Sequence, residues 1–204
     1  MRKLFSLKRI GFLLAASLLT ANANAVLISV YDAEGAMGSL ADAQAVIDAA
    51  AGPDARAETP DVWFSDVGTD PFGWGAGGPF PGGFDTTFVV SIVGAVDTDF
   101  YSHLYLAHDD GVELTVAGAT LYEFSTPTDF RESGALYLGA ASGMERLQGL
   151  YYENFGEADL FLWGYRRDGG GWEKASIKSV PEPGTLALLG LGLFGLGLSR
   201  RRKA

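Results

Sequence analysis

The chain has 204 residues, no cysteine and a formal net charge of −10. Its acidity is concentrated between Val26 and Glu182, where all 25 acidic residues but only seven basic ones lie, so this part has a net charge near −18. Such a charge argues against binding to nucleic acid or to anionic membrane surfaces. A domain without disulfides must depend on its hydrophobic core for stability.

The first 25 residues have the three parts of a secretory signal peptide. Basic residues come first (Arg2, Lys3, Lys8, Arg9), then the apolar residues 10–20, then the cleavage signal Ala23-Asn24-Ala25. The apolar stretch is only 11 residues long, whereas a membrane-spanning helix needs about 20. We therefore predict cleavage after Ala25, which makes Val26 the first residue of the mature protein.

Residues 26–179 are long enough for one domain with a proper core. Residues 26–31 form an apolar strand candidate, and Ser39 with Asp42 then predicts the start of a helix, as a capping box with Asp in place of Glu. Gly52-Pro53 ends this helix, whose apolar face we expect to pack on a sheet. Residues 68–84 are rich in glycine and proline and predict a long loop, from which Trp74 either stacks on a sugar ring or folds over the core.

The rest of the domain predicts short strands rich in β-branched and aromatic residues. They are expected at residues 61–65, 86–96, 100–107, 112–116, 120–124, 135–138, 147–152, 158–165 and 172–177, with residues 131–134 as a loop. Many short strands with turns between them and one early helix predict a mainly β fold, an antiparallel β-sandwich or barrel.

Two adjacent carboxylates and a glycine, Asp109-Asp110-Gly111, separate two of these strands. In one interpretation this is only a turn, in which the Asp side chains bind nearby backbone amides and Gly111 supplies a positive φ. In the other it is a Ca²⁺ site, because a hard divalent cation binds several oxygens and offsets the repulsion between the carboxylates. The tripeptide is common in turns, and its sequence leaves both interpretations open.

The C-terminal end has a third kind of pattern. Pro181-Glu182-Pro183 is followed by 16 charge-free residues, 184–199, and then by the basic residues 200–203. As a helix, the apolar segment would be roughly 24 Å long, slightly less than a bilayer core of about 30 Å, and the basic cluster is expected to stay cytoplasmic. A plain transmembrane tail anchor would leave Pro-Glu-Pro unexplained.

This order of parts over residues 180–204 closely resembles the PEP-CTERM sorting signal of Gram-negative bacteria. The resemblance implies that an exosortase in the inner membrane recognises the segment and removes it. It also implies that the protein is exported to the cell surface or to the exopolysaccharide matrix.

The domain itself resembles the protective-antigen type domain, a β-sandwich of bacterial toxins, glycosidases and yeast flocculins. The resemblance rests on residues 100–124, which include Asp-Asp-Gly, and on residues 149–164, which include Tyr-Glu-Asn and Leu-Phe-Leu-Trp. In carbohydrate-binding members, two aspartates joined by a cis peptide and an Asn on a neighbouring loop hold Ca²⁺, which coordinates sugar hydroxyls. The resemblance thus implies Asp109, Asp110 and Asn154 as metal ligands.

Three functions remain open at this point. The first is a non-catalytic, Ca²⁺-assisted carbohydrate-binding protein of the cell surface or extracellular polysaccharide. The second is a structural matrix or adhesion protein in which Asp109-Asp110 is only a turn. The third is a small glycoside hydrolase, which we do not favour because the sequence singles out no catalytic pair of carboxylates.

Overall fold

The computed structural model describes residues 25–65, 80 and 87–180. The predicted signal peptide, the loop with Trp74 and the apolar segment 184–199 lie outside the described residues, as do Pro181, Glu182 and Pro183. Among the residues that are described, no helix is long and apolar enough to cross a membrane. The boundaries of a mature domain at residues 26 and 179 stay a prediction.

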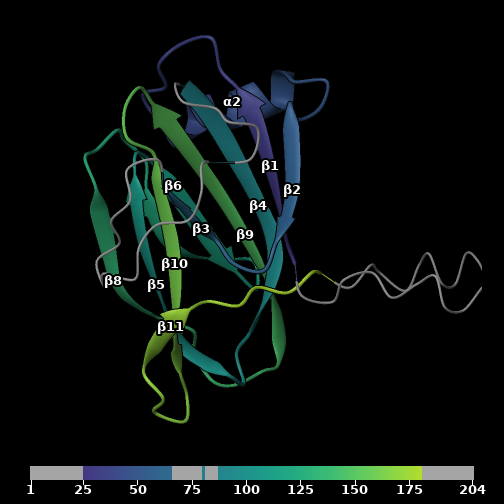
Figure 1. Cartoon of the computed structure of the whole chain (residues 1–204), viewed down its shortest axis with the longest axis vertical. Coiled ribbons are helices and arrows are strands. Elements are labelled where there is room, and N and C mark those ends of the chain that lie inside the picture. The colour runs from purple at the N-terminus through teal and green to yellow at the C-terminus, as the bar shows by residue number, and fades with distance from the viewer. Residues whose placement is uncertain (1–24, 66–79, 81–86, 181–204) are drawn as a thin grey trace, which may run out of the picture.

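Two antiparallel sheets make up the described part of the chain (Figure 1). The six-stranded sheet has the order β2 (Ala55–Thr59), β1 (Val26–Asp32), β4 (Thr87–Asp97), β9 (Met144–Asn154), β6 (Val112–Val116) and β7 (Ala119–Phe124). The five-stranded sheet has the order β11 (Trp172–Lys174), β10 (Asp159–Arg166), β5 (Tyr101–Asp109) and β8 (Arg131–Tyr137), and β3 (Trp63–Ser65) also pairs with β10. The predicted mainly β, antiparallel sandwich is confirmed.

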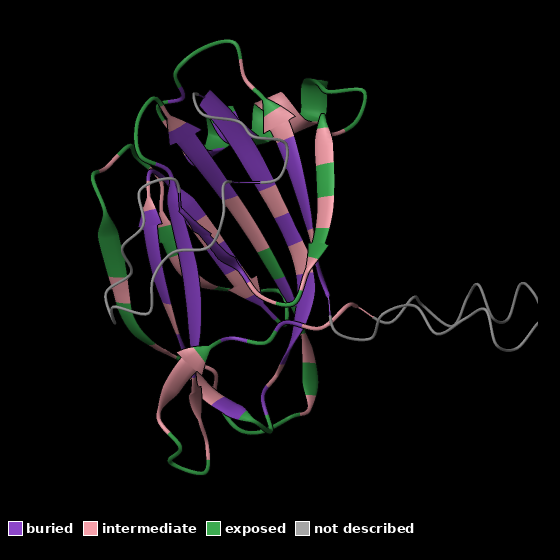
Figure 2. Ribbon diagram, viewed as in Figure 1, coloured by how far each residue is buried: buried purple, intermediate pink, exposed green. Residues whose placement is uncertain are grey.

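The main core lies between the two sheets. Alternate residues of the central strands are buried there, among them Phe88 of β4, Leu106 of β5, Tyr151 of β9 and Leu160 of β10. In Figure 2 the central strands are mostly buried, while β8 is largely exposed and β2 alternates between intermediate and exposed residues, both at sheet edges. Burial of these apolar side chains stabilises a domain that has no disulfides.

The single described helix, α2 (Leu40–Ala49), begins as its sequence predicts. The Ser39 side chain accepts a hydrogen bond from the Asp42 amide, and the Asp42 carboxylate accepts one from the Ser39 hydroxyl in return. Leu40 and Ala43 then pack against Tyr152 on the outer face of the six-stranded sheet. The predicted packing of the helix on a sheet is therefore confirmed.

Several strands differ from the prediction; β11, for example, ends at Lys174, three residues before its predicted end. β2 was not expected, because Ala-Arg-Ala-Glu-Thr has no large apolar side chain; it is an edge strand that pairs only with β1. β8 begins at Arg131, not at residue 135, and is also an edge strand, so its sequence need not be apolar. β9 continues to Asn154, two residues beyond the predicted end, where Asn154 pairs with Thr87.

Candidate functional site

The Asp-Asp-Gly turn connects the two sheets, since β5 ends at Asp109 and β6 begins at Val112. The peptide bond between Asp109 and Asp110 is cis, as the family resemblance implied. Gly111 does not have the positive φ that the turn interpretation assumed. A glycine is needed there for a different reason, because a β-carbon would lie 2.2 Å from Cε1 of the Tyr152 ring.

Three carboxylates converge at this turn. Carboxylate oxygens of Asp109, Asp110 and Glu153 lie within 4.8 Å of one another. Asp110 is 6% and Glu153 2% exposed, so two of the three side chains are nearly withdrawn from water. They border a pocket of about 680 Å³ between the β7–β8 loop and the β9–β10 loop. The pocket is lined by Asp109, Asp110, Pro127, Thr128, Asp129, Glu153, Asn154, Phe155, Gly156 and Glu157.

The Asp110 carboxylate accepts hydrogen bonds from two segments that line the pocket. Its Oδ1 accepts a hydrogen bond from the Thr128 amide at 2.8 Å, and its Oδ2 accepts one from the Asn154 amide at 2.8 Å. Burial raises the pKa of the Asp110 carboxyl, and these two hydrogen bonds counteract that rise. Through these hydrogen bonds Asp110 links the β7–β8 loop to the end of β9.

The buried His108 side chain is hydrogen-bonded to the backbone of the turn. Because the carbonyl oxygen of Asp110 can only accept, Nδ1 of His108 donates to it, and Nε2 is left to accept from the Tyr122 hydroxyl. Burial lowers the pKa of His108 to about 4, so the ring is neutral at pH 7. His103, five residues earlier in β5, contacts Tyr137 instead.

The negative charge at Asp109 is not balanced by any basic residue that lines the described pocket. Burial is the main cause that raises the pKa of its carboxyl to about 7, and the neighbouring carboxylates of Asp110, Asp159, Asp129 and Glu157 contribute the rest of this rise. A divalent cation would remove this repulsion, and clustered carboxylate oxygens are the ligands that Ca²⁺ prefers. The donor set therefore fits a hard cation.

Tyr151 joins two of the three carboxylate residues from inside the core. Its hydroxyl lies within hydrogen-bonding distance of the Asp109 carbonyl oxygen and of Oε2 of Glu153, which is 2.9 Å away. The hydroxyl has one proton, so it donates to one of these acceptors at a time. Full burial and the nearby carboxylates raise its pKa well above the ordinary value, so the phenol stays neutral.

Asn154, the third ligand expected from the sequence, is not brought into the cluster by its side chain. Its Oδ1 accepts from the Met37 amide at 2.6 Å and its Nδ2 donates to the Met37 carbonyl at 2.7 Å. Only the backbone amide of Asn154 reaches Asp110. A ligand role for the Asn154 side chain stays a prediction.

Sequence reasoning missed Glu153, although the signal was present. Side chains alternate along a strand, so Tyr151 and Glu153 share one face of β9, and Tyr152 and Asn154 share the other. Tyr151 lies in the core between the sheets, whereas Tyr152 packs under α2. Because the predicted strand ended at residue 152, this alternation was not carried on to Glu153.

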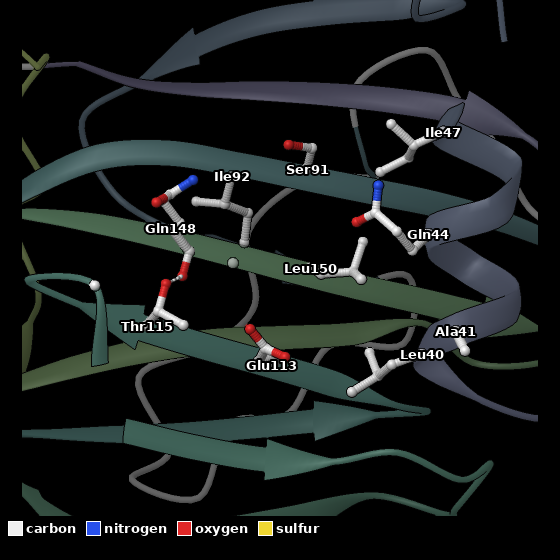
Figure 3. Close-up of a pocket in the computed structure, with 12 residues that line it drawn as sticks. Leu40, Ala41, Gln44, Ile47, Ser91, Ile92, Glu113, Thr115, Gln148 and Leu150 are labelled. Atoms are coloured by element: carbon white, nitrogen blue, oxygen red, sulfur yellow. Dashed lines mark hydrogen bonds between the residues drawn. The ribbon is translucent and has the colours of Figure 1, made fainter. Parts of the chain in front are cut away.

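A second hollow, of about 540 Å³, lies between α2 and the outer face of the six-stranded sheet. Figure 3 shows Leu40, Gln44 and Ile47 of the helix facing Leu150 of β9. Glu113 is the one acidic side chain among the described residues that line it. The hollow therefore lacks the convergent charged groups that distinguish the pocket at Asp109.

Residues 179–203 match the family model of the PEP-CTERM protein-sorting motif. The chain ends in a PEP-CTERM sorting motif. The motif indicates an exported protein that an exosortase sorts to the cell surface. No curated protein matches the sequence.

Solved structures resemble the domain that precedes the motif. The PA14 domain of the MpAFP antifreeze protein superimposes with a TM-score of 0.58 at 14% identity, covering 79% of this chain and 94% of that one. A PA14 domain from an RTX adhesin, described as sugar-binding, gives 0.56 at 17% identity, with 78% and 99% covered. The epithelial adhesin 9 A domain of Candida glabrata, solved with Galβ1-3GlcNAc, gives 0.52 at 9% identity, with 79% and 91% covered. The described domain has the PA14 fold.

In this PA14 fold the acidic pocket combines elements from far apart in the chain. Asp109 and Asp110 come from the β5–β6 connection, Thr128 and Asp129 from the β7–β8 loop, and Glu153 from the end of β9. The sheets hold these segments together through pairing of β5 with β10 and of β6 with β9. The result is a concave group of carboxylate oxygens drawn from three segments of the chain.

Proposed function

We propose that this protein is a non-catalytic carbohydrate-binding protein of the cell surface or exopolysaccharide matrix, sorted through its PEP-CTERM segment at the inner membrane of a Gram-negative bacterium. Its PA14-type domain would bind sugar at the pocket of Asp109, Asp110 and Glu153, with Ca²⁺ as the ion. The observation that carries the proposal is the convergence of these three carboxylates in a pocket between two loops.

The roles of the residues follow from their surroundings. Asp109 and Glu153 present carboxylate oxygens to the pocket, and Asp110 does so while it also binds the amides of Thr128 and Asn154. A bound Ca²⁺ would supply further coordination positions for sugar hydroxyl oxygens, since it takes six to eight oxygen ligands. Asn154 stays a candidate ligand through its remaining acceptor capacity, although Met37 occupies its side chain.

The test is calcium-dependent binding by the purified full-length chain. Thermal unfolding should shift upward with millimolar Ca²⁺ and much less with Mg²⁺, which keeps several waters and favours strict octahedral sites. A polysaccharide or glycan panel should then bind in Ca²⁺ and be released by EDTA. Glu153→Gln should weaken both effects, whereas Glu58→Gln, an equal loss of charge on exposed β2, should change neither. Glycan binding that persists in EDTA would refute the calcium-dependent proposal.

A structural matrix protein without ligand is the second candidate, and one observation favours it. Both carboxylate oxygens of Asp110 already bind backbone amides, so the aspartate has a structural task independent of any ion. In that case Asp110→Asn should lower stability, because an amide NH₂ would face a backbone N–H, and Ca²⁺ should shift neither protein. In the calcium-binding case the shift seen in the wild type should disappear in the variant.

A further inference from the structure

The β7–β8 loop and the β9–β10 loop border the acidic pocket, and each exposes a phenylalanine. Phe155 lines the pocket itself and is 65% exposed. Phe130, 40% exposed, follows Asp129 and lines a neighbouring hollow that shares Thr128 and Asp129 with the pocket. An exposed aromatic ring keeps apolar surface in contact with water, so a ligand that covers the ring gains free energy from its burial.

The Phe155 backbone also has an unusual conformation. Phe155 has φ +64°, a left-handed conformation that is uncommon for a bulky residue, directly after Glu153 and Asn154 at the end of β9. The sheet fixes Glu153 at 2% exposure, while two residues later the ring of Phe155 stands in solvent. A flat apolar surface thus lies beside the carboxylate cluster, at the rim of the same pocket.

Further acidic residues surround the pocket. Besides the three converging carboxylates, exposed Asp129 and Glu157 line it, and its described lining includes no lysine or arginine. With all five carboxylates ionised, one divalent cation leaves them a net charge of −3, and Arg131 in the neighbouring hollow is offset by Glu132 beside it. A ligand with its own carboxylate or sulfate would be repelled, since two like charges about 5–6 Å apart interact by about 1–3 kcal/mol at effective dielectric constants between those of a protein surface and water.

Resting on the proposed function, we infer that the pocket selects an uncharged sugar ring, stacked on Phe155, and rejects uronic acids and sulfated sugars. A pyranose has a face of C–H groups that matches an aromatic ring and an edge of hydroxyls that matches the oxygen-binding site. Phe155 supplies the apolar surface, and Asp129 and Glu157 supply the charge discrimination. The ligand class is therefore a neutral glycan.

The test uses the full-length chain in saturating Ca²⁺ with matched pairs of methyl glycosides: glucoside with glucuronide, and galactoside with galacturonide. Saturation-transfer NMR gives a dissociation constant for each. The neutral member of a pair that binds should do so at least about ten-fold more tightly. Asp129→Asn combined with Glu157→Gln should reduce that ratio, because it removes two negative charges that repel the uronide. Neither substitution changes the three converging carboxylates, so the proposed cation site is kept.

Substitutions of Phe155 test separately whether its ring stacks on the sugar. Phe155→Ala should weaken binding of the neutral sugar about ten-fold, while Phe155→Tyr retains it and the Ca²⁺-induced thermal shift stays unchanged in both. Phe100→Ala is the matched control, since Phe100 is 42% exposed but packs beside Tyr101 and Arg166, away from the pocket lining.

The outcomes separate the two levels of the argument. Equal or tighter binding of the uronides, or unchanged binding by Phe155→Ala, would overturn this inference and leave the proposed function standing. If no member of either pair binds in Ca²⁺ but a glycan panel does, the inference of a single stacked neutral ring is also overturned. If neither binds, the proposed function itself fails, and the inference fails with it.

Discussion

Replacing Asp109 by asparagine should stabilise the protein without calcium and prevent its stabilisation by calcium. Among the described residues, none donates a hydrogen bond to the Asp109 carboxylate, so the substitution removes charge with little loss of contacts. The carboxyl pKa is about 7 in the folded protein against 3.8 ordinarily, with burial as the first cause and Asp110 as the second. The ionised carboxylate therefore opposes folding.

The sign and size of the effect follow from linkage. Between pH 4 and 7 the folded protein holds a proton on Asp109 that the unfolded chain releases, so this group costs stability as the pH rises and costs most above pH 7. The difference between a carboxyl pKa of 3.8 and one of about 7 corresponds to about 4 kcal/mol of unfolding free energy. Solvent screening of a half-buried group reduces this to about 1–2 kcal/mol. For a domain of this size that amounts to several degrees in the unfolding midpoint.

Calcium should reverse which of the two proteins, wild type or Asp109→Asn, unfolds at the higher temperature. An ion at about 100 times its dissociation constant adds roughly 2.7 kcal/mol to the native state that binds it. In EDTA at pH 8, Asp109→Asn should therefore unfold at a higher temperature than the wild type, and in millimolar Ca²⁺ at a lower one. His108, whose low pKa makes stability fall as the pH drops from 6.5 towards 4, acts in both proteins and leaves their difference unaffected.

The assay is thermal unfolding of both proteins at pH 5 and pH 8, each in EDTA and in Ca²⁺. In EDTA the gap between them should narrow at pH 5, where the wild-type carboxyl is protonated. Glu58→Gln serves as the control for a general loss of negative charge. A variant that is less stable than wild type in EDTA at pH 8 would show that the Asp109 carboxylate makes a favourable contact, and the reasoning would be wrong.

Two further substitutions test the local structure by the same unfolding measurement. Gly111→Ala should cost about 1–3 kcal/mol, because the added β-carbon collides with the ring of Tyr152, while Gly35→Ala, with nothing within 4 Å, should be nearly neutral; equal midpoints for both would contradict the close approach of Tyr152 to Gly111. Ser39→Ala should cost about 1 kcal/mol through loss of the helix cap, and an unchanged midpoint would mean that the cap contributes nothing to the fold.

The sequence predicted those parts of the fold that local patterns determine. The Ser39 cap and the runs of β-branched and aromatic residues in β4 and β10 are read directly from residue types. β2 was missed because pairing with β1 alone makes it a strand, and its own residues carry no signal. The start of β8 was missed for a similar reason, since its pairing with β5 and the bulge there depend on distant residues.

At the site, the sequence singled out the Asp109-Asp110 turn, but it did not include Glu153, whose carboxylate lies close to both aspartates. The pairing of Asp109 with Asp110 came from the family resemblance, and so did the cis peptide. The contacts of Asp110 with Thr128, and of Asn154 with Met37, join segments 18 and 117 residues apart. No local pattern in the chain indicates such contacts, because they result from how the two sheets bring their loops together.

The alternation along β9 explains how the residues at its end divide their work. Tyr151 and Glu153 face the inside of the sandwich, where a carboxylate can meet Asp109 and where burial requires a partner for it. Asn154 faces the helix side, where an amide can satisfy both the N–H and the C=O of Met37, a task that no carboxylate can perform because it cannot donate. The acid and the amide at the end of β9 are therefore not interchangeable. A Glu153→Asn, Asn154→Glu double exchange should lose both the charge cluster and the loop contact, although it keeps the composition and net charge of the chain.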